Sequence, residues 1–274
     1  MAITAAEVNK LRQMTGAGMM DCKNALVEND GDFDKAIDFL RKKGQKLASK
    51  RADRDANEGV VIAKTNDDKT FAGIIMINCE TDFVAKNEEF VKFCQSIIDL
   101  AIEKTPKSED ELKSLEINGR TVADLLIDQI GKIGEKIELT HYHFIEGNMN
   151  FAYNHHGNRL ATIVGFNKKC DENLGKDVAM QIASMAPVAI DKETVSADVI
   201  EKELEIYRDL IRQEGKPENM VEQIAQGKLN KFFKDSTLLN QDFIKEGKKS
   251  VGQHIKEMDK DLVVTSFKRL MLGA

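Results

Sequence analysis

The spacing of the apolar residues changes along this chain, and the changes limit the folds that it can adopt. Up to about residue 45, apolar residues recur every three or four positions, which is typical of amphipathic helices. Residues 60–63 and 70–77 are continuous apolar runs of the kind found in β-strands. Helical spacing recurs between later strands, and a long helical stripe follows residue 199. We therefore expect an α+β fold built from several units.

The first 45 residues predict three short helices. Thr4 and Glu7 have the spacing of a capping box, which starts the first helix. Asp32 follows a turn and can cap the third helix, and Gly44 is expected to end it. The apolar face of the second helix is formed by Met19, Cys22 and Leu26.

The middle of the chain predicts two successive units of strands and helices. Residues 60–63 and 70–77 are joined by a polar turn at 66–69, so they form a β-hairpin. Further helices are expected at 86–103, 122–133 and 171–185, and further strands at 136–145, 150–155, 159–166 and 262–267.

A pair of long helices is expected within the second of these units. Ile200, Leu204, Tyr207 and Ile211 form a narrow apolar stripe, and the segment 215–217 (GKP) ends one helix and starts the next. The other faces are charged, so the pair should project like a coiled coil. The predicted units are residues 1–55 (three helices and a linker), 56–140, 141–186 with 235–274, and 187–234 (the helical hairpin).

Composition excludes several classes of protein. The four cysteines include no CxxC pair, which argues against a zinc ribbon and a disulfide framework. No apolar run approaches the roughly 20 residues that span a bilayer, and the N-terminus (MAIT) lacks the pattern of a secretory signal. We therefore expect a soluble cytoplasmic protein without membrane contact. The net charge of −6 disfavours general nucleic-acid binding.

Seven basic residues lie between residues 41 and 54, without an aromatic residue among them. They are interpreted as a solvated linker or the end of an extended helix, since nucleic-acid bases need stacking partners. The alternative function is an RNA-binding, translation-associated factor that uses this stretch. A steep salt dependence of RNA binding would distinguish it.

The chain lacks the common catalytic motifs: it has no P-loop, GxSxG or HExxH sequence. His141 and His143 share a face of a predicted strand, and with neighbouring carboxylates they could bind a metal. Surface histidines are the favoured interpretation, for these two and for His155 and His156. Cys79 ends an apolar strand and is expected to be buried rather than nucleophilic. We expect no cofactor, no metal and no covalent chemistry.

Residues 78–87 join a predicted strand to a predicted helix, and they contain the apolar pair Phe83 and Val84 within a polar stretch. One interpretation is that Asp82 caps the helix and Phe83 packs beneath it. The alternative is that residues 81–84, called here the wedge segment, present Phe83 outward beside a carboxylate. A rigid aromatic on a supported loop is a good anchor for a partner protein.

Two long segments of the chain resemble the signature sequences of the elongation factor Ts family. Residues 14–26 (MTGAGMMDCKNAL) are similar to its N-terminal signature, and residues 78–86 (NCETDFVAK) are similar to its second signature. Shorter similarities occur at residues 156–159 (HGNR), 215–217 (GKP) and 250–253 (SVGQ), so the resemblance covers nearly the whole chain.

The resemblance implies a fold and a function. The fold is an N-terminal three-helix domain of the ubiquitin-associated type, two α/β core subdomains with antiparallel sheets, and an inserted antiparallel coiled-coil hairpin. The function is guanine nucleotide exchange on elongation factor Tu, the GTPase that carries aminoacyl-tRNA. In the family, the segment matching Thr81, Asp82, Phe83 and Val84 enters the GTPase near its nucleotide site and dislodges Mg²⁺, which promotes release of GDP so that GTP can bind.

The resemblance also implies further contacts with elongation factor Tu in its GDP-bound and nucleotide-free states, and it leaves open a homodimer within the assembly. Some members of the family continue past the last strand into an extra helical segment. This sequence ends at residue 274, so that contact is expected to be absent or supplied elsewhere. Core packing is the alternative role for the helical-domain residues, and for Met19 it is favoured. The residues implied are Met19, Met20 and Asp21 of the helical domain, and His156, Gly157 and Arg159 for a different domain of the GTPase.

Overall fold

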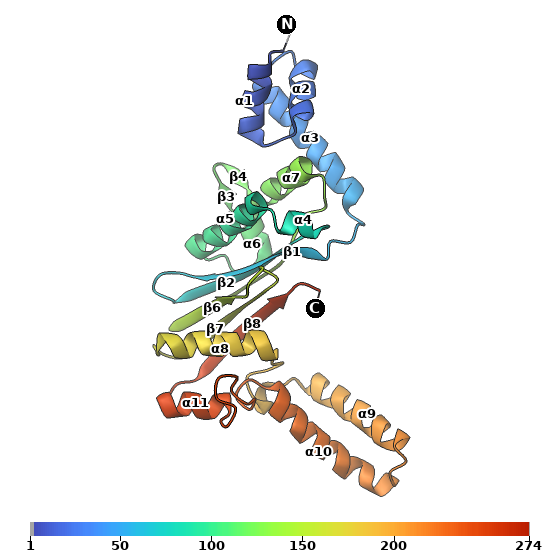
Figure 1. Ribbon diagram of the computed structural model, residues 1–274, viewed down its shortest axis with the longest axis vertical. Helices are drawn as coiled ribbons and strands as arrows, with labels where there is room; N and C mark the ends of the chain where they lie inside the picture. The colour runs from blue at the N-terminus through green and yellow to red at the C-terminus, as the bar shows by residue number, and fades with distance from the viewer. Residues whose placement is uncertain (1–2, 274) are drawn as a thin grey trace.

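The computed structural model describes residues 3–273. Met1, Ala2 and Ala274 lie outside them, so the expectation that the N-terminus is not a secretory signal falls partly outside the described residues. Figure 1 shows an elongated molecule with three helices at one end, strands and helices in the middle, and a pair of helices at the other end. Helices and antiparallel strands are mixed along the chain, which confirms the predicted α+β class.

Three helices, called here the helical unit, pack around an apolar core of their own. Thr4 caps the first helix by accepting a hydrogen bond from the Glu7 amide, and the Glu7 carboxylate accepts one from the Thr4 amide, which confirms the predicted capping box. Asp32 caps the third helix, as predicted. The helices are α1 (Ala5–Thr15), α2 (Met19–Glu28) and α3 (Phe33–Arg51), and their core includes Val8, Leu11, Cys22, Leu26 and Ala36.

The predicted end of α3 at Gly44 is wrong, because the helix continues to Arg51. Gly44 is buried where α3 crosses α7 (Val122–Ile133), and a β-carbon at this position would lie 3.2 Å from the carbonyl oxygen of Ile127. A β-carbon on Gly131 of α7 would in turn lie 3.3 Å from the Gly44 Cα atom. Glycine therefore serves here as the contact point of two helices rather than as a helix end.

Three antiparallel strands form the first sheet in the order β1-β2-β5. The predicted hairpin is present, with Val60 paired to Ile77. Helices α5 and α7 cover one face of this sheet, and their apolar side chains share a core with it. The bounds are β1 (Glu58–Thr65), β2 (Phe71–Cys79), β5 (Glu138–Glu146), α5 (Glu88–Lys104) and α6 (Glu109–Ser114), with a small hairpin of β3 (Glu116–Ile117) and β4 (Arg120–Thr121) that was not predicted.

The second sheet has the order β6-β7-β8, again antiparallel. Its last strand was predicted at 262–267 but spans Val264–Met271. Pairing with β7 sets these limits, because Val264 lies opposite Phe166 and Met271 lies opposite Leu160. The remaining elements of this unit are β6 (Met149–Asn154), β7 (Leu160–Phe166), α8 (Glu172–Met185) and α11 (Val251–Met258).

The two sheets pack face to face between two layers of helices. Their shared buried cluster combines Val61 and Ile74 of the first sheet with Ile163 and Leu270 of the second. Helices α8 and α11 cover the far face of the second sheet (Figure 1). Strand β2 is therefore buried along its whole length. This explains why residues 70–77 are apolar without the alternation of a half-exposed strand.

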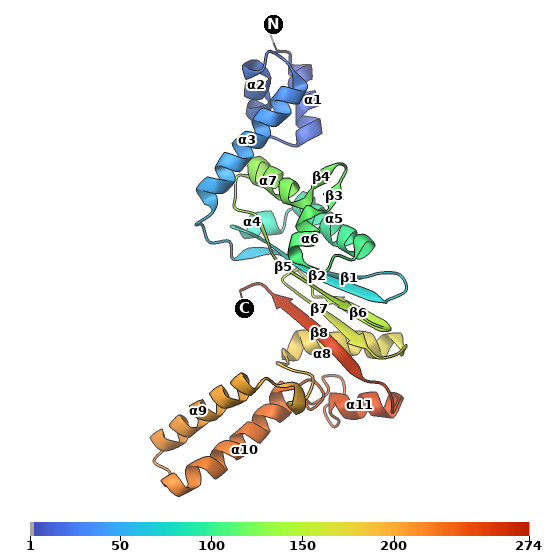
Figure 2. The same ribbon diagram turned by 180° about the vertical axis from the view of Figure 1, so that it is seen from behind.

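Helices α9 (Ala197–Gln213) and α10 (Glu218–Ser236) lie side by side and extend away from the sheets (Figures 1 and 2). Gly215 adopts a positive φ of 72° in the turn between them, and Pro217 directly precedes the second helix. A single turn of 3-10 helix, Lys192–Thr194, lies before α9. Among residues 3–273, no helix combines the length and the apolar character that a membrane span needs.

Candidate functional site

The wedge segment forms part of a separate short helix, α4, which spans Asp82–Ala85. Thr81 is its N-cap, and its hydroxyl accepts a hydrogen bond from the Val84 amide at 3.4 Å. The prediction that Asp82 caps the following helix is wrong, because Asp82 is the first residue of α4 and Asn87 caps α5. Figure 1 shows α4 between α7 and the first sheet, beside the connection from α3 to β1.

Helix α4 has one anchored side and one free side. Val84 and Ala85 pack against the apolar core beneath α5. Phe83 is 84% exposed, more than any other large apolar residue in the described part of the chain. The interpretation that Phe83 packs beneath the helix is therefore wrong. The ring stands on an anchored turn, where it is available to a partner protein.

Two carboxylates hold the base of α4. The Glu135 carboxylate accepts hydrogen bonds from the amides of Glu80 and Thr81, both at 3.1 Å, and from the Thr81 hydroxyl at 2.7 Å. The Glu80 carboxylate accepts one from the amide of Lys136 at 2.6 Å. The dipeptides 80–81 and 135–136 therefore exchange hydrogen bonds, although they lie more than 50 residues apart in the sequence.

Glu80 also connects the wedge segment to the end of the helical unit. Its carboxylate accepts hydrogen bonds from Arg51 at 2.7 Å and from Arg54 at 3.0 Å. Burial would raise the pKa of Glu80, but the bonds from the Lys136 amide and the two guanidinium groups outweigh it and lower the pKa to about 2. Sequence reasoning missed this role of Arg51 and Arg54, because no local pattern connects them to Glu80.

The surroundings of two further side chains, Asp82 and Cys79, determine their charge states. Asp82 forms an exposed ion pair with Lys86 at 2.6 Å, and this bond lowers the pKa of Asp82. Cys79 is buried, as expected, and burial together with the charges of Glu135 and Glu58 raises its pKa to about 12. Its thiol donates a hydrogen bond to the Thr81 carbonyl at 3.2 Å, so it supports the turn as a neutral group.

The predicted contact residues of the helical unit lie at the start of α2. Met19 is 54% exposed and Met20 is 65% exposed, so the core packing favoured for Met19 is wrong. The face that α2 buries begins at Cys22 instead. Asp21 is half-buried and pairs with Lys43 of α3 at 2.5 Å.

His156, Gly157 and Arg159 lie in the turn between β6 and β7, where Gly157 adopts a φ of 85°. Arg159 pairs with Glu58, and Glu58 lies opposite Cys79 in the first sheet. The fold therefore brings this turn to the end of the sheets from which the wedge segment emerges. In both views, α4 and the C-terminal end of β8 lie on the same side of the molecule (Figures 1 and 2).

In the described part of the chain, the histidines do not gather with other potential metal ligands. The rings of His141 and His143 lie 6.2 Å apart on β5, and burial together with Lys268 and His141 lowers the pKa of His143. His155 bonds to the hydroxyl of Tyr153 at 3.0 Å. Within residues 3–273, no three His, Cys, Asp or Glu side chains gather as metal ligands would.

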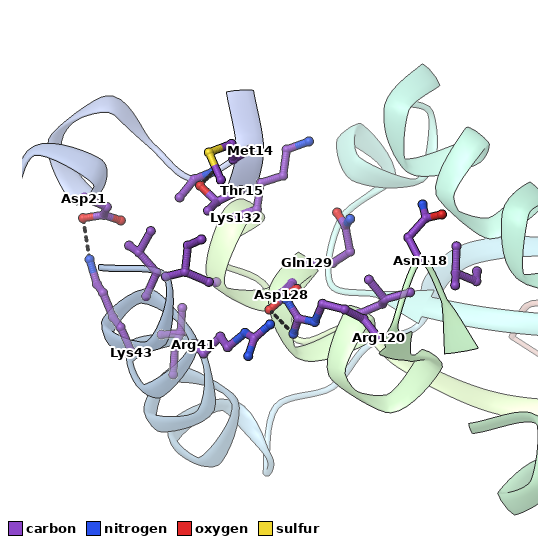
Figure 3. Close-up of a pocket in the computed structure, with 18 residues that line it drawn as sticks. Met14, Thr15, Asp21, Arg41, Lys43, Asn118, Arg120, Asp128, Gln129 and Lys132 are labelled. Carbon is purple, nitrogen blue, oxygen red and sulfur yellow. Dashed lines mark hydrogen bonds and ion pairs between the residues drawn. The ribbon is translucent and has the colours of Figure 1, made fainter. Parts of the chain in front are cut away.

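A cavity of about 430 Å³ lies where the helical unit meets α7 and the β3-β4 hairpin. Figure 3 shows that its two carboxylates already face cations. Asp21 pairs with Lys43 and Asp128 pairs with Arg120, each at 2.5 Å. Asp21 is the one predicted contact residue among its lining residues. The cavity therefore lies at the interface between the helical unit and the core that carries α7, and no residue of the wedge segment lines it.

The basic stretch at residues 41–54 is largely helical, and several of its cations are paired within the chain. Arg41 lies 3.5 Å from Asp38, Lys43 binds Asp21, and Arg51 and Arg54 bind Glu80. This pairing reduces the charge that the stretch offers to a nucleic acid. Nucleic-acid binding by the stretch stays an untested alternative. The side chains of Lys42, Lys46 and Lys50 are exposed on α3.

The chain has relatives of known family over its whole length. A family model described as "Elongation factor TS" matches residues 80–274. The elongation factor Ts of Flavobacterium psychrophilum is 53% identical over 273 residues, which cover 99% of both chains. That of Christiangramia forsetii is 51% identical with the same coverage, and that of Porphyromonas gingivalis is 47% identical over 275 residues, covering both chains completely.

Proposed function

The chain belongs to the elongation factor Ts family and is a translation elongation factor, and on this premise we propose that it is a guanine nucleotide exchange factor for elongation factor Tu. It binds the GDP-bound GTPase, disturbs its Mg²⁺ site and promotes release of GDP, so that GTP can bind. It makes and breaks no covalent bond. The observation that supports this most directly is the 84% exposure of Phe83 on a helix whose other side is anchored in the core.

The wedge segment acts by weakening the ligands of the metal. GTPases hold the phosphates of GDP through Mg²⁺ and backbone donors. The Phe83 ring is inserted beside this site and displaces a structural element that carries metal ligands. Asp82, next to it, adds negative charge or competes for the same donors. Because Asp82 forms an exposed ion pair with Lys86, it can exchange this partner at little cost.

Thermodynamic linkage sets a requirement on this mechanism. If the exchange factor weakens GDP binding by some factor, GDP weakens binding of the exchange factor by the same factor. The chain therefore binds nucleotide-free elongation factor Tu more tightly than the GDP complex. GTP or GDP completes the cycle by displacing the exchange factor.

We propose two further contact surfaces on elongation factor Tu. The exposed side chains of Met19 and Met20, with Asp21, make a second contact with the GTPase domain. The turn with His156, Gly157 and Arg159 contacts a different domain of the partner. Their support is exposure of the two methionines, and for the turn its position at the same end of the sheets as the wedge segment.

We propose that the helical unit is a domain of the ubiquitin-associated type and that the α9-α10 hairpin is a coiled coil, whose apolar contact includes Ile211, Val221 and Ala225.

The division of the chain follows the expected units, apart from one boundary: residues 1–55, 56–140, 141–186 with 235–274, and 187–234. Strand β5 crosses the boundary at 140 and pairs with β2 on both sides of it, so we move that boundary to the turn after Glu146. The protein acts in the cytoplasm, and a homodimer within the assembly with the GTPase is compatible with this arrangement.

Release of labelled GDP from elongation factor Tu tests the proposed function. Catalytic amounts of the chain are expected to accelerate release in the presence of excess unlabelled GDP. The chain should also bind nucleotide-free elongation factor Tu more tightly than the GDP complex. An unchanged release rate at saturating chain concentration would rule the function out.

A further inference from the structure

The Glu135 carboxylate accepts three hydrogen bonds from the residues at the base of the wedge segment. The donors are two successive amides, those of Glu80 and Thr81, and the Thr81 hydroxyl. We propose that Glu135 is a positioning residue for nucleotide exchange, which holds α4 so that Phe83 points at the partner. This inference rests on the proposed function of the wedge segment.

The bonds to Glu135 satisfy groups that the secondary structure leaves free. The amides of Glu80 and Thr81 follow the end of β2 and precede α4. Hydrogen bonds to a carboxylate are stronger than those between neutral groups. The Thr81 hydroxyl donates to Glu135 and accepts from Val84, so Glu135 also orients the cap of α4.

The return bond makes the arrangement rigid. Glu80 accepts from the amide of Lys136, and Arg51 and Arg54 bind the same carboxylate. Glu80 and Glu135 thus each bind the backbone of the other's segment. The position of α4 is therefore fixed relative to the start of β5 and to the end of α3.

Rigidity matters because α4 has few other anchors. It is a single turn, and only Val84 and Ala85 bury apolar surface against the core. If the wedge segment occupied its outward position for only a fraction of the time, the maximal exchange rate would fall to that fraction of its full value. Initial binding through the helical unit and the β6-β7 turn would change much less. Loss of Glu135 is therefore expected to lower the maximal rate of GDP release more than it changes the half-saturating concentration of the exchange factor.

The test measures stimulated GDP release from elongation factor Tu over a range of exchange-factor concentrations. Glu135→Ala is expected to lower the maximal rate about tenfold, as for loss of several hydrogen bonds to a charged group, with about threefold or less change in the half-saturating concentration. Glu135→Gln keeps one acceptor oxygen and is expected to retain an intermediate rate. Glu138→Ala is the matched control, since this carboxylate contacts Lys136 at 3.4 Å but no group of the wedge segment.

Combination with Phe83→Ala separates positioning from general damage. If Glu135 acts through Phe83, the double variant Phe83→Ala/Glu135→Ala is no slower than Phe83→Ala alone. Losses that multiply, or an unchanged maximal rate in folded Glu135→Ala, would overturn the positioning role. If Phe83→Ala itself has no effect on release, the proposed function of the wedge segment fails, whatever Glu135 does. Circular dichroism and thermal unfolding verify that each variant is folded.

Discussion

Gly44 of α3 and Gly131 of α7 face each other where these helices cross, and a β-carbon on Gly131 would lie only 3.3 Å from the Gly44 Cα atom. The distance between packed helices depends on the side chains at their contact. Two glycines therefore allow an unusually close approach. This contact joins the helical unit to the core that carries the wedge segment.

A large side chain at Gly44 should force the two helices apart. Gly44→Leu is expected to lower the free energy of unfolding by roughly 2 kcal/mol, as is usual for overpacking of a buried contact. Gln45→Leu introduces the same side chain at the neighbouring, exposed position and should change stability by less than about 0.5 kcal/mol. Urea unfolding followed by circular dichroism measures both. Equal stability of the two variants would contradict the close crossing.

Removal of the Phe83 ring should separate function from stability. Phe83→Ala is expected to slow stimulated GDP release about tenfold or more, because an exposed aromatic anchor dominates contacts of this kind. The unfolding free energy should change by less than about 0.5 kcal/mol, since the ring is almost fully exposed. Met258→Ala on α11 is a control that removes another exposed apolar side chain. A folded Phe83→Ala variant with normal exchange would exclude the wedge mechanism.

The Glu80 carboxylate should contribute to stability in a pH-dependent way. Its pKa is about 2 in the folded protein and 4.5 ordinarily, so its contribution is fully present above pH 4.5 and is lost as the pH falls through 2. Glu80→Gln cannot titrate. The variant is expected to be roughly 2 kcal/mol less stable than the parent above pH 5, and this difference should shrink towards pH 2.

Urea unfolding at several pH values measures that difference directly. Glu116→Gln, at an exposed position of β3, is the control and should differ little from the parent at any pH. A difference for Glu80→Gln that stays constant from pH 6 to pH 2 would mean that the bonds from Lys136, Arg51 and Arg54 do not depend on the charge of Glu80.

The same substitution should have opposite effects in two helices. A β-carbon on Gly175 of α8 would lie 2.1 Å from the buried ring of Phe151. One on Gly227 of α10 would meet no atom of residues 3–273 within 4 Å, apart from its chain neighbours and the backbone of its own helix. Gly175→Ala is expected to destabilise the protein by about 2 kcal/mol, because the ring has no space to move. Gly227→Ala should stabilise it by about 0.5–1 kcal/mol through helix propensity. Thermal unfolding of the pair decides, and a stabilising Gly175→Ala would contradict the packing of α8 on β6.

Elements with local start and stop signals were predicted well. Helix α7 has the predicted bounds, because Thr121 caps it and Gly134 ends it in the left-handed conformation. The hairpin of β1 and β2 was predicted from its two apolar runs and the polar turn between them. Helix α4 was missed as a separate element, because one turn is too short for any periodicity. The β3-β4 hairpin was missed because each of its strands has only two residues.

Errors arose where a residue's role depends on a distant neighbour. Gly44 has the local signature of a helix end, but its lack of a side chain is used at the crossing with α7. Met19 continues the apolar spacing of α2, but its side chain lies at the start of the helix and remains exposed. The local sequence could not distinguish the two roles of each residue, because the same pattern is compatible with a helix end or a helix contact at Gly44, and with a buried or an exposed side chain at Met19.

The sequence by itself determined the α+β class, most helices and strands, and the family of the chain, because periodicity, caps and long signatures are properties of neighbouring residues. Only the tertiary structure decided how these elements act together. Phe83 points outward because Val84 and Ala85, on the other side of α4, pack against the core, and α4 keeps that position because Glu135, far along the chain, binds the residues before it. Such contacts join segments whose meeting depends on the folding of everything between them, so no local pattern encodes them.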